Sequence, residues 1–238
     1  HALPSSDGDS MNFTYGLEFE IQDLSLRSAA AALTRAGIPC RAQDYNHDTD
    51  TVWKTVPDGS GVDAEVVSPV LTDERLNECS RVARALQSAG ARVNARAGFH
   101  VHFGVKGVDQ IGTGDALANL VVNYYTTHPV FQQVVAPSRI GSRWCRIHSL
   151  ESAHDIASEI RLGEYNFSSR DHYLRYESLN LQAIGRHGTA EVRLHQGTLN
   201  GTKALAWVEF LKSMFRYSAE GKTFTEAYYI NATPEQRL

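Results

Sequence analysis

Residues 12–21, NFTYGLEFEI, contain the pattern that decides the fold class. Apolar side chains occupy every second position, and Thr14, Glu18 and Glu20 occupy positions between them. Because successive side chains of a strand point to opposite faces, this alternation predicts a strand with one buried face and one polar face. Glu18 and Glu20 are then expected to share the polar face, about 7 Å apart.

Two later stretches, residues 98–105 and 189–195, show the same alternation. His100 and His102 share the polar face of the first stretch, and the polar face of the second carries Glu191, Arg193 and His195. Each face alone fits the solvated side of an antiparallel sheet. Solvated faces usually carry Lys, Thr, Ser and Gln, whereas these strands together present mainly Glu, His and Arg. We therefore interpret the three polar faces jointly as a functional site.

The rest of the chain mixes strands and helices without a regular βαβ order. Further strands are predicted at residues 52–53, 65–71 and 176–183, and helices at residues 25–37, 72–90, 115–127, 129–135, 152–162 and 202–219. This order predicts one α+β domain, with helices packed on the outer side of a largely antiparallel sheet. Residues 1–10 are polar and aperiodic and precede Met11, so we interpret them as a cloning remnant and place the domain at residues 11–238.

Composition excludes several function classes. The chain has 238 residues, with 23 Lys and Arg against 27 Asp and Glu and a formal net charge of −4, so no overall basic footprint indicates nucleic-acid binding. No run approaches the ~18 apolar residues of a membrane span, and a cytoplasmic protein is expected. The three cysteines lack CxxC spacing and are expected to be reduced thiols rather than a zinc or redox site.

The candidate residues indicate a particular chemistry. Several carboxylates with one or two imidazoles suit hard cations such as Mg²⁺ or Mn²⁺. Arg193, two residues after Glu191, is suited to neutralising charge on a transferred phosphoryl group. The chain lacks a GxxxxGK[ST] loop, so phosphate would be held by metal ions and arginines, with Arg139, Arg143 and Arg146 as the available loop arginines.

Short motifs along nearly the whole chain after Met11 resemble those of the amidoligases, carboxylate–amine ligases related to glutamine synthetase. They occur in the family's order: GLEFEI (16–21), Trp53, DGS (58–60), EVVSPVL (65–71), VNARAGFHVHFG (93–104), PSR (137–139), YESLNLQA (176–183) and TAEVRLHQGTLN (189–200). The chain is expected to depart from glutamine synthetase in having neither that enzyme's N-terminal domain nor an obvious ammonium pocket.

This resemblance implies a glutamine-synthetase-like catalytic domain, a curved and largely antiparallel sheet whose concave face binds ATP with two or more Mg²⁺ or Mn²⁺ ions. The implied cation ligands are Glu18, Glu20, Glu65, Glu191 and one of the pair His100 and His102. The implied nucleotide-binding residues are Arg139, Arg143, Asn180 and Arg193, of which Arg193 would contact the γ-phosphate. Asn180 and Gln182 are also expected to project to one side of the strand at residues 176–183 and hold substrate.

The activity implied is ATP-dependent formation of an amide or isopeptide bond through an acyl phosphate, with Arg193, His195 and Glu65 as catalytic residues. His195 or Glu65 would be the general base. The substrates would be a small-molecule or peptide carboxylate and an amine, and a homo-oligomer is compatible with the sequence.

Two other functions remain open at this point. One is a metal-dependent hydrolase or cupin-like metalloenzyme that uses His100, His102, Glu191 and His195 without nucleotide. The other is a metal-stabilised binding module whose Arg-rich loop at residues 137–148 grips an acidic partner.

Overall fold

The fold was established from a computed structural model, which describes residues 13–59, 61–105, 114–169, 171 and 173–224. The remnant expected at residues 1–10 and Ser60 of the DGS motif lie outside these residues. The described strands form one seven-stranded sheet in the order β2-β3-β4-β1-β5-β7-β6. Neighbouring strands are antiparallel except for β2 and β3, which are parallel. The α+β class is therefore confirmed, with a mixed and largely antiparallel sheet.

The longest strands lie next to one another near the centre of the sheet, and the strands toward its edges are shorter. They span β1 Tyr15–Ile21, β2 Cys40–Ala42, β3 Trp53–Val56, β4 Ala64–Val67, β5 Gly98–Gly104, β6 Leu179–Asn180 and β7 Thr189–Gln196. The helices span α1 Leu26–Arg35, α2 Glu78–Ser88, α3 Gly114–Thr126, α4 His128–Val134, α5 Leu150–Leu162, α6 Gln182–His187 and α7 Gly201–Ala219, with 3₁₀ turns at Asp73–Arg75 and Leu174–Tyr176.

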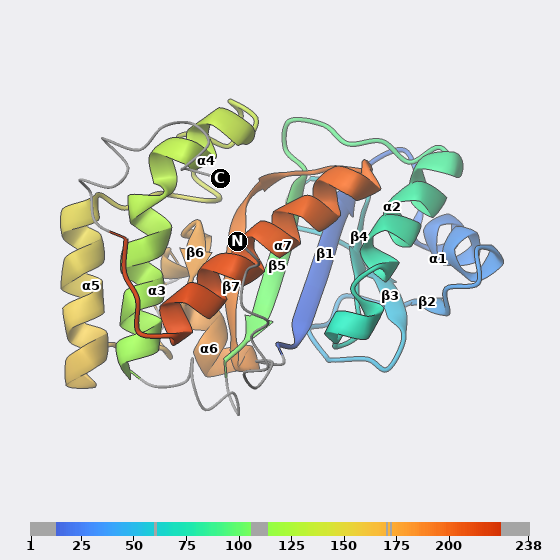
Figure 1. The fold of residues 1–238 in the computed structure, drawn as a ribbon. Coiled ribbons are helices and arrows are strands. Elements are labelled where there is room, and N and C mark those ends of the chain that lie inside the picture. Colours follow the sequence, from blue (N-terminus) through green and yellow to red (C-terminus); the bar gives the residue numbers. More distant parts are fainter. Residues whose placement is uncertain (1–12, 60, 106–113, 170, 172, 225–238) are drawn as a thin grey trace, which may run out of the picture.

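Helix α7 crosses one face of the sheet in front of β5 and β1 (Figure 1). Helices α2 and α1 lie on the same side near one end of α7, and α3 and α5 lie beyond its opposite end. The alternation of the central strands explains this layering. Phe103 of β5 is fully buried on the helix-covered face, where its ring stacks on that of Phe215 of α7 at 4.0 Å between centroids. The helices therefore cover the apolar face, and the polar side chains of the same strands are left on the opposite face.

The strand predicted at residues 176–183 is wrong. Residues 176–183 do not form a continuous alternating strand: β6 contains only Leu179 and Asn180, and α6 starts at Gln182. The side chain of Asn180 accepts a hydrogen bond from the backbone N–H of Gln182 (3.0 Å), which turns the chain into the helix. Helix α6 is closed by Gly188 in the left-handed conformation.

The three cysteines carry no disulfide, in agreement with the sequence-based expectation. Among the described helices, none is long and apolar enough to cross a membrane.

An ion-pair cluster fastens α7 to the edge of β1. Asp73 accepts hydrogen bonds from the Tyr15 hydroxyl (2.6 Å) and from the Lys212 ammonium (2.6 Å). Partial burial alone would raise the pKa of Asp73, but the hydrogen bonds from Lys212 and Tyr15 hold it below its ordinary value. The folded state therefore favours the ionised form of this carboxyl group.

We expect Asp73→Asn to destabilise the protein at pH 7 and to make much less difference near pH 3. Because the folded-state pKa of Asp73 is depressed, its stabilisation is present above the unfolded-state pKa, about 3.9, and is lost as the pH falls through the folded-state pKa. Urea unfolding of both proteins at the two pH values measures this, with Asp155→Asn on the exposed side of α5 as the control. An equal difference at pH 7 and pH 3 would contradict the expectation.

Candidate active site

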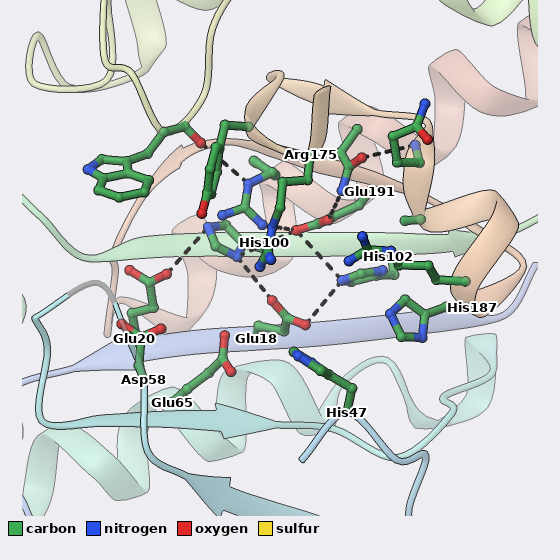
Figure 2. A pocket seen from close by; sticks show the side chains of 18 of the residues that line it. Glu18, Glu20, His47, Asp58, Glu65, His100, His102, Arg175, His187 and Glu191 are labelled. Atoms are coloured by element: carbon green, nitrogen blue, oxygen red, sulfur yellow. Dashed lines mark hydrogen bonds and ion pairs between the residues drawn. The ribbon is translucent and has the colours of Figure 1, made fainter. Parts of the chain in front are cut away.

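The register of the central strands aligns the polar side chains into rows across the sheet. Glu18 of β1 lies opposite His100 of β5, and Glu20 of β1 lies opposite Glu65 of β4. A third pair, His102 and Glu191, joins β5 to β7. Side chains from four neighbouring strands therefore meet on the face of the sheet opposite α7, as Figure 2 shows. The six residues expected from the sequence to ligate cations are brought together.

Within this cluster, two overlapping groups have the geometry of cation ligands. One donor atom each from Glu18, His100 and Glu191 lies within 4.8 Å of the others, and the same holds for Glu20, Glu65 and His100. His100 belongs to both groups and is buried. Oxygen-rich donor sets with one imidazole suit Mg²⁺ or Mn²⁺. Two adjacent groups that share one residue fit the expectation of more than one cation.

Hydrogen bonds orient the ligand side chains. His100 Nδ1 lies 3.0 Å from one oxygen of Glu18, and His102 Nε2 lies 3.1 Å from the other. Glu20 accepts a hydrogen bond of 2.6 Å from the backbone N–H of Gly98. A Cβ at Gly98 would come within 2.5 Å of His100 Nε2, so only glycine leaves room for the imidazole. Gly98 therefore has a direct steric role beside the imidazole.

The carboxylates of the cluster differ in their electrostatics. Burial alone would raise the pKa of Glu18, but the charge of His102 and hydrogen bonds from both histidines hold it well below its ordinary value. Burial raises the pKa of Glu65 well above its ordinary value, and the neighbouring charges of Glu18 and Glu20 add to the effect. Glu65 thus sits where negative charge is in excess. A bound cation would supply the missing positive charge, so the residues fit the expected metal ions.

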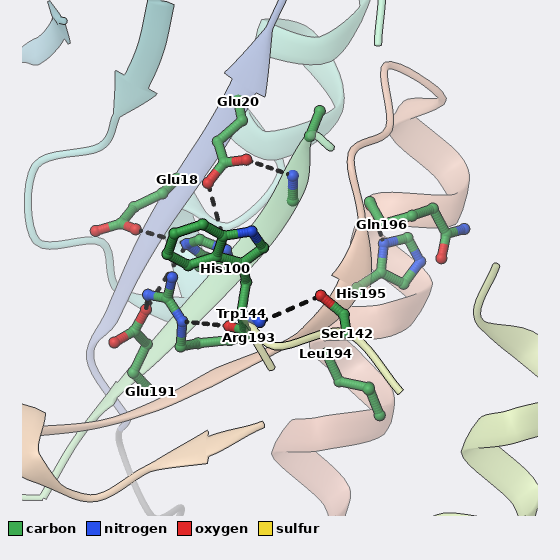
Figure 3. A network of polar contacts seen from close by, with 12 residues as sticks. Glu18, Glu20, His100, Ser142, Trp144, Glu191, Arg193, Leu194, His195 and Gln196 are labelled. Carbon is green, nitrogen blue, oxygen red and sulfur yellow. Dashed lines mark hydrogen bonds and ion pairs between the residues drawn. The ribbon is translucent and has the colours of Figure 1, made fainter. Parts of the chain in front are cut away.

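Arg193 balances part of this charge on the β7 side. Its guanidinium forms an ion pair with Glu191 and donates a hydrogen bond to the backbone oxygen of Trp144 (3.4 Å; Figure 3). Asn180 donates a second hydrogen bond to Glu191, 2.6 Å long. Burial alone would lower the pKa of Arg193, but Glu191, Glu18 and Glu20 raise it above its ordinary value, so the guanidinium stays charged.

The motifs and this geometry agree with a comparison against protein families. A family model described as "putative amidoligase enzyme" matches residues 11–215. The chain belongs to the amidoligase family. The family is one of amide-forming ligases. No curated protein matches the chain.

His195 does not share a face with Glu191 and Arg193 in this amidoligase, contrary to the sequence-based expectation. The register of β5 against β7 shifts between Phe99 and Val101, where one residue of β5, His100, faces two of β7, Arg193 and Leu194. A bulge of this kind moves the following side chains to the other face. The His195 ring consequently packs against Phe99 and Trp207 on the α7 side of the sheet.

Burial lowers the pKa of His195 to about 4. A neutral, core-facing imidazole is not placed to accept a proton from a substrate on the opposite face. The four residues of the cupin-like alternative are likewise divided between the two faces of the sheet.

The loop arginines also differ from expectation. Arg139 lines the cavity over the cluster but is buried, and its guanidinium donates to the backbone oxygens of Arg193 (2.6 Å) and Leu194 (3.3 Å). It therefore holds the bulge of β7 in shape. Arg143 is exposed, lies 4.6 Å over the ring of Trp144 and is absent from the described lining of the cavity. The expected nucleotide contact of Arg143 is thus not supported by its position.

The cluster forms the floor of a cavity of about 330 Å³ in the amidoligase, and its walls contain residues that the sequence did not single out for function. These wall residues include Tyr45, His47, Arg96, Trp144, Arg175, Tyr176, Arg186 and His187. Arg96 lies within the motif at residues 93–104 and Arg175 lies directly before the motif at residues 176–183, and these positions are the signal that could have found them. His47 and His187 come from segments far apart in the sequence and face each other beside His102 (Figure 2).

Proposed function

We propose that this amidoligase is an ATP-dependent carboxylate–amine ligase that works through an acyl phosphate. The observation that carries the proposal is the pair of cation-ligand groups sharing His100, with the charged Arg193 beside them in one cavity. Carboxylates and a fixed guanidinium are the groups that phosphoryl transfer from a nucleotide requires.

The walls of the cavity support nucleotide binding. Arg96, Arg175 and Arg186 line it and offer guanidinium groups to the phosphates. Trp144 and Tyr176 pack edge to face at 4.9 Å between ring centroids and provide an aromatic wall on the β7 side. Asn180 and Gln182 also line the cavity, as expected for substrate or nucleotide contacts, although they come from a strand end and a helix start rather than from one strand.

The proposed reaction consists of two successive displacement steps. An oxygen of the substrate carboxylate forms a bond to the γ-phosphorus of ATP, and the bond to the bridging oxygen breaks, releasing ADP. The amine then attacks the acyl carbon, the bond to the phosphate oxygen breaks, and the amine loses a proton. Bound divalent cations would neutralise phosphate charge during the transfer. Arg193 stabilises charge on the transferred group, and of the two candidate bases only Glu65 lines the cavity.

The arrangement also supports a glutamine-synthetase-like catalytic domain. The polar face of a largely antiparallel sheet carries the cluster, and the opposite face is covered by helices. Because the carboxylates, the shared imidazole and the arginine all project from the sheet, the site is built on rigid elements rather than on loops.

A screen of ADP release tests the function. The protein is incubated with Mg²⁺ and ATP against a panel of carboxylates and amines, and products are identified by mass. The proposal expects at least one pair for which ADP formation requires both partners and a product of their summed mass less one water. ADP release that is independent of carboxylate and amine would contradict it, as would cation binding without any effect of ATP on thermal stability.

A further inference from the structure

A second, smaller cavity of about 150 Å³ adjoins the first and contains the unusual side chain Lys54. Five residues line both cavities, so the two are compartments of one site: Glu18, His47, Glu65, His102 and His187. Apart from Asp48 and Lys54, the remaining lining of the small compartment is neutral, including Thr14, Ser68 and Val70.

Lys54 is a buried cation that pairs with no carboxylate in the described part of the chain. Its side chain belongs to a residue only 2% exposed, and its ammonium donates to two neutral oxygens, the side-chain oxygen of Asn46 (2.6 Å) and the backbone oxygen of Asp48 (2.6 Å). Lys212 and Lys222, in contrast, pair with the carboxylates of Asp73 and Glu220. Among the described residues no ion pair joins Lys54 to a carboxylate. An ammonium has three donors, and a buried charge is costly unless it is paired.

The register of the sheet places Lys54 in the same row as the cluster. Lys54 of β3 lies opposite Val67 of β4, and Val67 lies opposite Glu18 of β1, so all three share the row that continues to His100. Adjacent strands are about 4.8 Å apart, which puts the backbones of Lys54 and Glu18 about 10 Å apart. A small substrate can span that distance with one end at Lys54 and the other at the carboxylate cluster.

We propose that the Lys54 compartment binds the acyl substrate through a second carboxylate, so that the substrates are small dicarboxylates or peptide ends with two carboxylates. This inference rests on the proposed ligase function. The carboxylate to be activated lies toward Glu18 and Glu65, where the cations are expected, and the second carboxylate completes the coordination of the Lys54 ammonium. Beside the Lys54 ammonium a carboxylate is favoured over a cationic amine, which assigns this end of the compartment to the acyl substrate rather than to the amine.

The alternative role of Lys54 is structural, because its two hydrogen bonds tie the segment at residues 43–50 to β3. Asn46→Ala separates the two roles. It removes one of these ties and leaves the ammonium in place. If Lys54 acts only by holding the segment, Asn46→Ala and Lys54→Met should have the same effect on binding.

Calorimetric titration of the full chain with Mg²⁺ and without ATP tests the compartment. The probes are malonate, succinate, glutarate and adipate, matched monocarboxylates, and a tripeptide ending in aspartate. We expect one dicarboxylate or the tripeptide to bind at least about tenfold more tightly than its monocarboxylate match, a difference of ~1.4 kcal/mol. Lys54→Met should remove that preference, whereas Lys54→Arg, Asn46→Ala and the exposed control Lys203→Met should largely keep it.

The tripeptide arm distinguishes a peptide end from a free dicarboxylate as the source of the second carboxylate. Absence of any dicarboxylate preference in the unaltered protein, or a preference that survives Lys54→Met, would overturn the inference. Because binding is measured without ATP, its outcome is separate from that of the ligase proposal. A protein that binds dicarboxylates through Lys54 but never forms ADP would refute the ligase function alone.

Discussion

Replacing Glu18 by glutamine is expected to weaken cation binding strongly and to reduce ADP formation even more. Glu18 contacts His100 and His102 and belongs to one of the two ligand groups. Glutamine keeps the shape but removes the negative charge and places an amide N–H₂ where an oxygen should face a cation. Losing an outer partner of a metal ligand costs about 10–100-fold in affinity, so losing a direct donor should cost about a hundredfold or more. ADP formation should fall by roughly a thousandfold.

Titration with Mn²⁺, followed by electron paramagnetic resonance, measures the affinity, and the ADP assay measures turnover on the same samples. Glu151→Gln in the exposed first turn of α5 is the matched control and should change neither. Thermal unfolding without cation verifies that the variant is folded. Unaltered Mn²⁺ affinity in Glu18→Gln would show that the cluster does not bind cations as proposed.

The parts of the site that lie on uninterrupted strands were predictable from the sequence. In β1 and β5 every second side chain faces the helices, and Glu18, Glu20, His100 and His102 therefore face the other way. The pleat of a strand is a local property, so neighbouring residues suffice to predict it. The α+β class followed from the same alternation together with the helix patterns between the strands.

His195 could not be placed in this way. The bulge that turns it into the core involves only a slip of one residue between β5 and β7, and TAEVRLHQ alternates equally well with or without the slip. What stabilises the bulge is Arg139, which donates to the backbone oxygens of Arg193 and Leu194 from more than 50 residues away in the chain. A local pattern carries no information about such a contact.

His47 and His187 show the same limit for the cavity walls. Each comes from a polar segment that resembles an ordinary surface loop or turn, and each acquires its place only because β3 and β7 flank the central strands. Lys54 is similar: a single lysine in a short strand gives no indication of burial until the segment at residues 43–50 covers it. Residues that gain their environment from the tertiary fold are the ones that sequence patterns miss.

Arg193→Ala is expected to separate catalysis from cation binding, in contrast to Glu18→Gln. Arg193 is the guanidinium that pairs with Glu191 beside the cluster, and its removal leaves the carboxylates with less compensating positive charge. Mn²⁺ should therefore bind at least as tightly as in the unaltered protein. ADP formation should nevertheless fall by about 10²–10³-fold, because the proposed preorganised donor to the transferred phosphoryl group is lost.

Arg193→Lys tests whether the planar geometry of the guanidinium matters in addition to its positive charge. The arginine reaches Glu191 with one N–H and the Trp144 carbonyl with another, and a lysine ammonium lacks this planar fork. We expect it to recover only part of the lost rate. Arg143→Ala, on the exposed loop over the Trp144 ring, is the matched arginine control and should retain most activity. If ADP formation in Arg193→Ala stays within about threefold of that of the unaltered protein, Arg193 does not stabilise charge during phosphoryl transfer. The same conclusion follows if Arg143→Ala reduces ADP formation more than Arg193→Ala does. In either case the exposed loop has to be reconsidered as the source of this stabilisation.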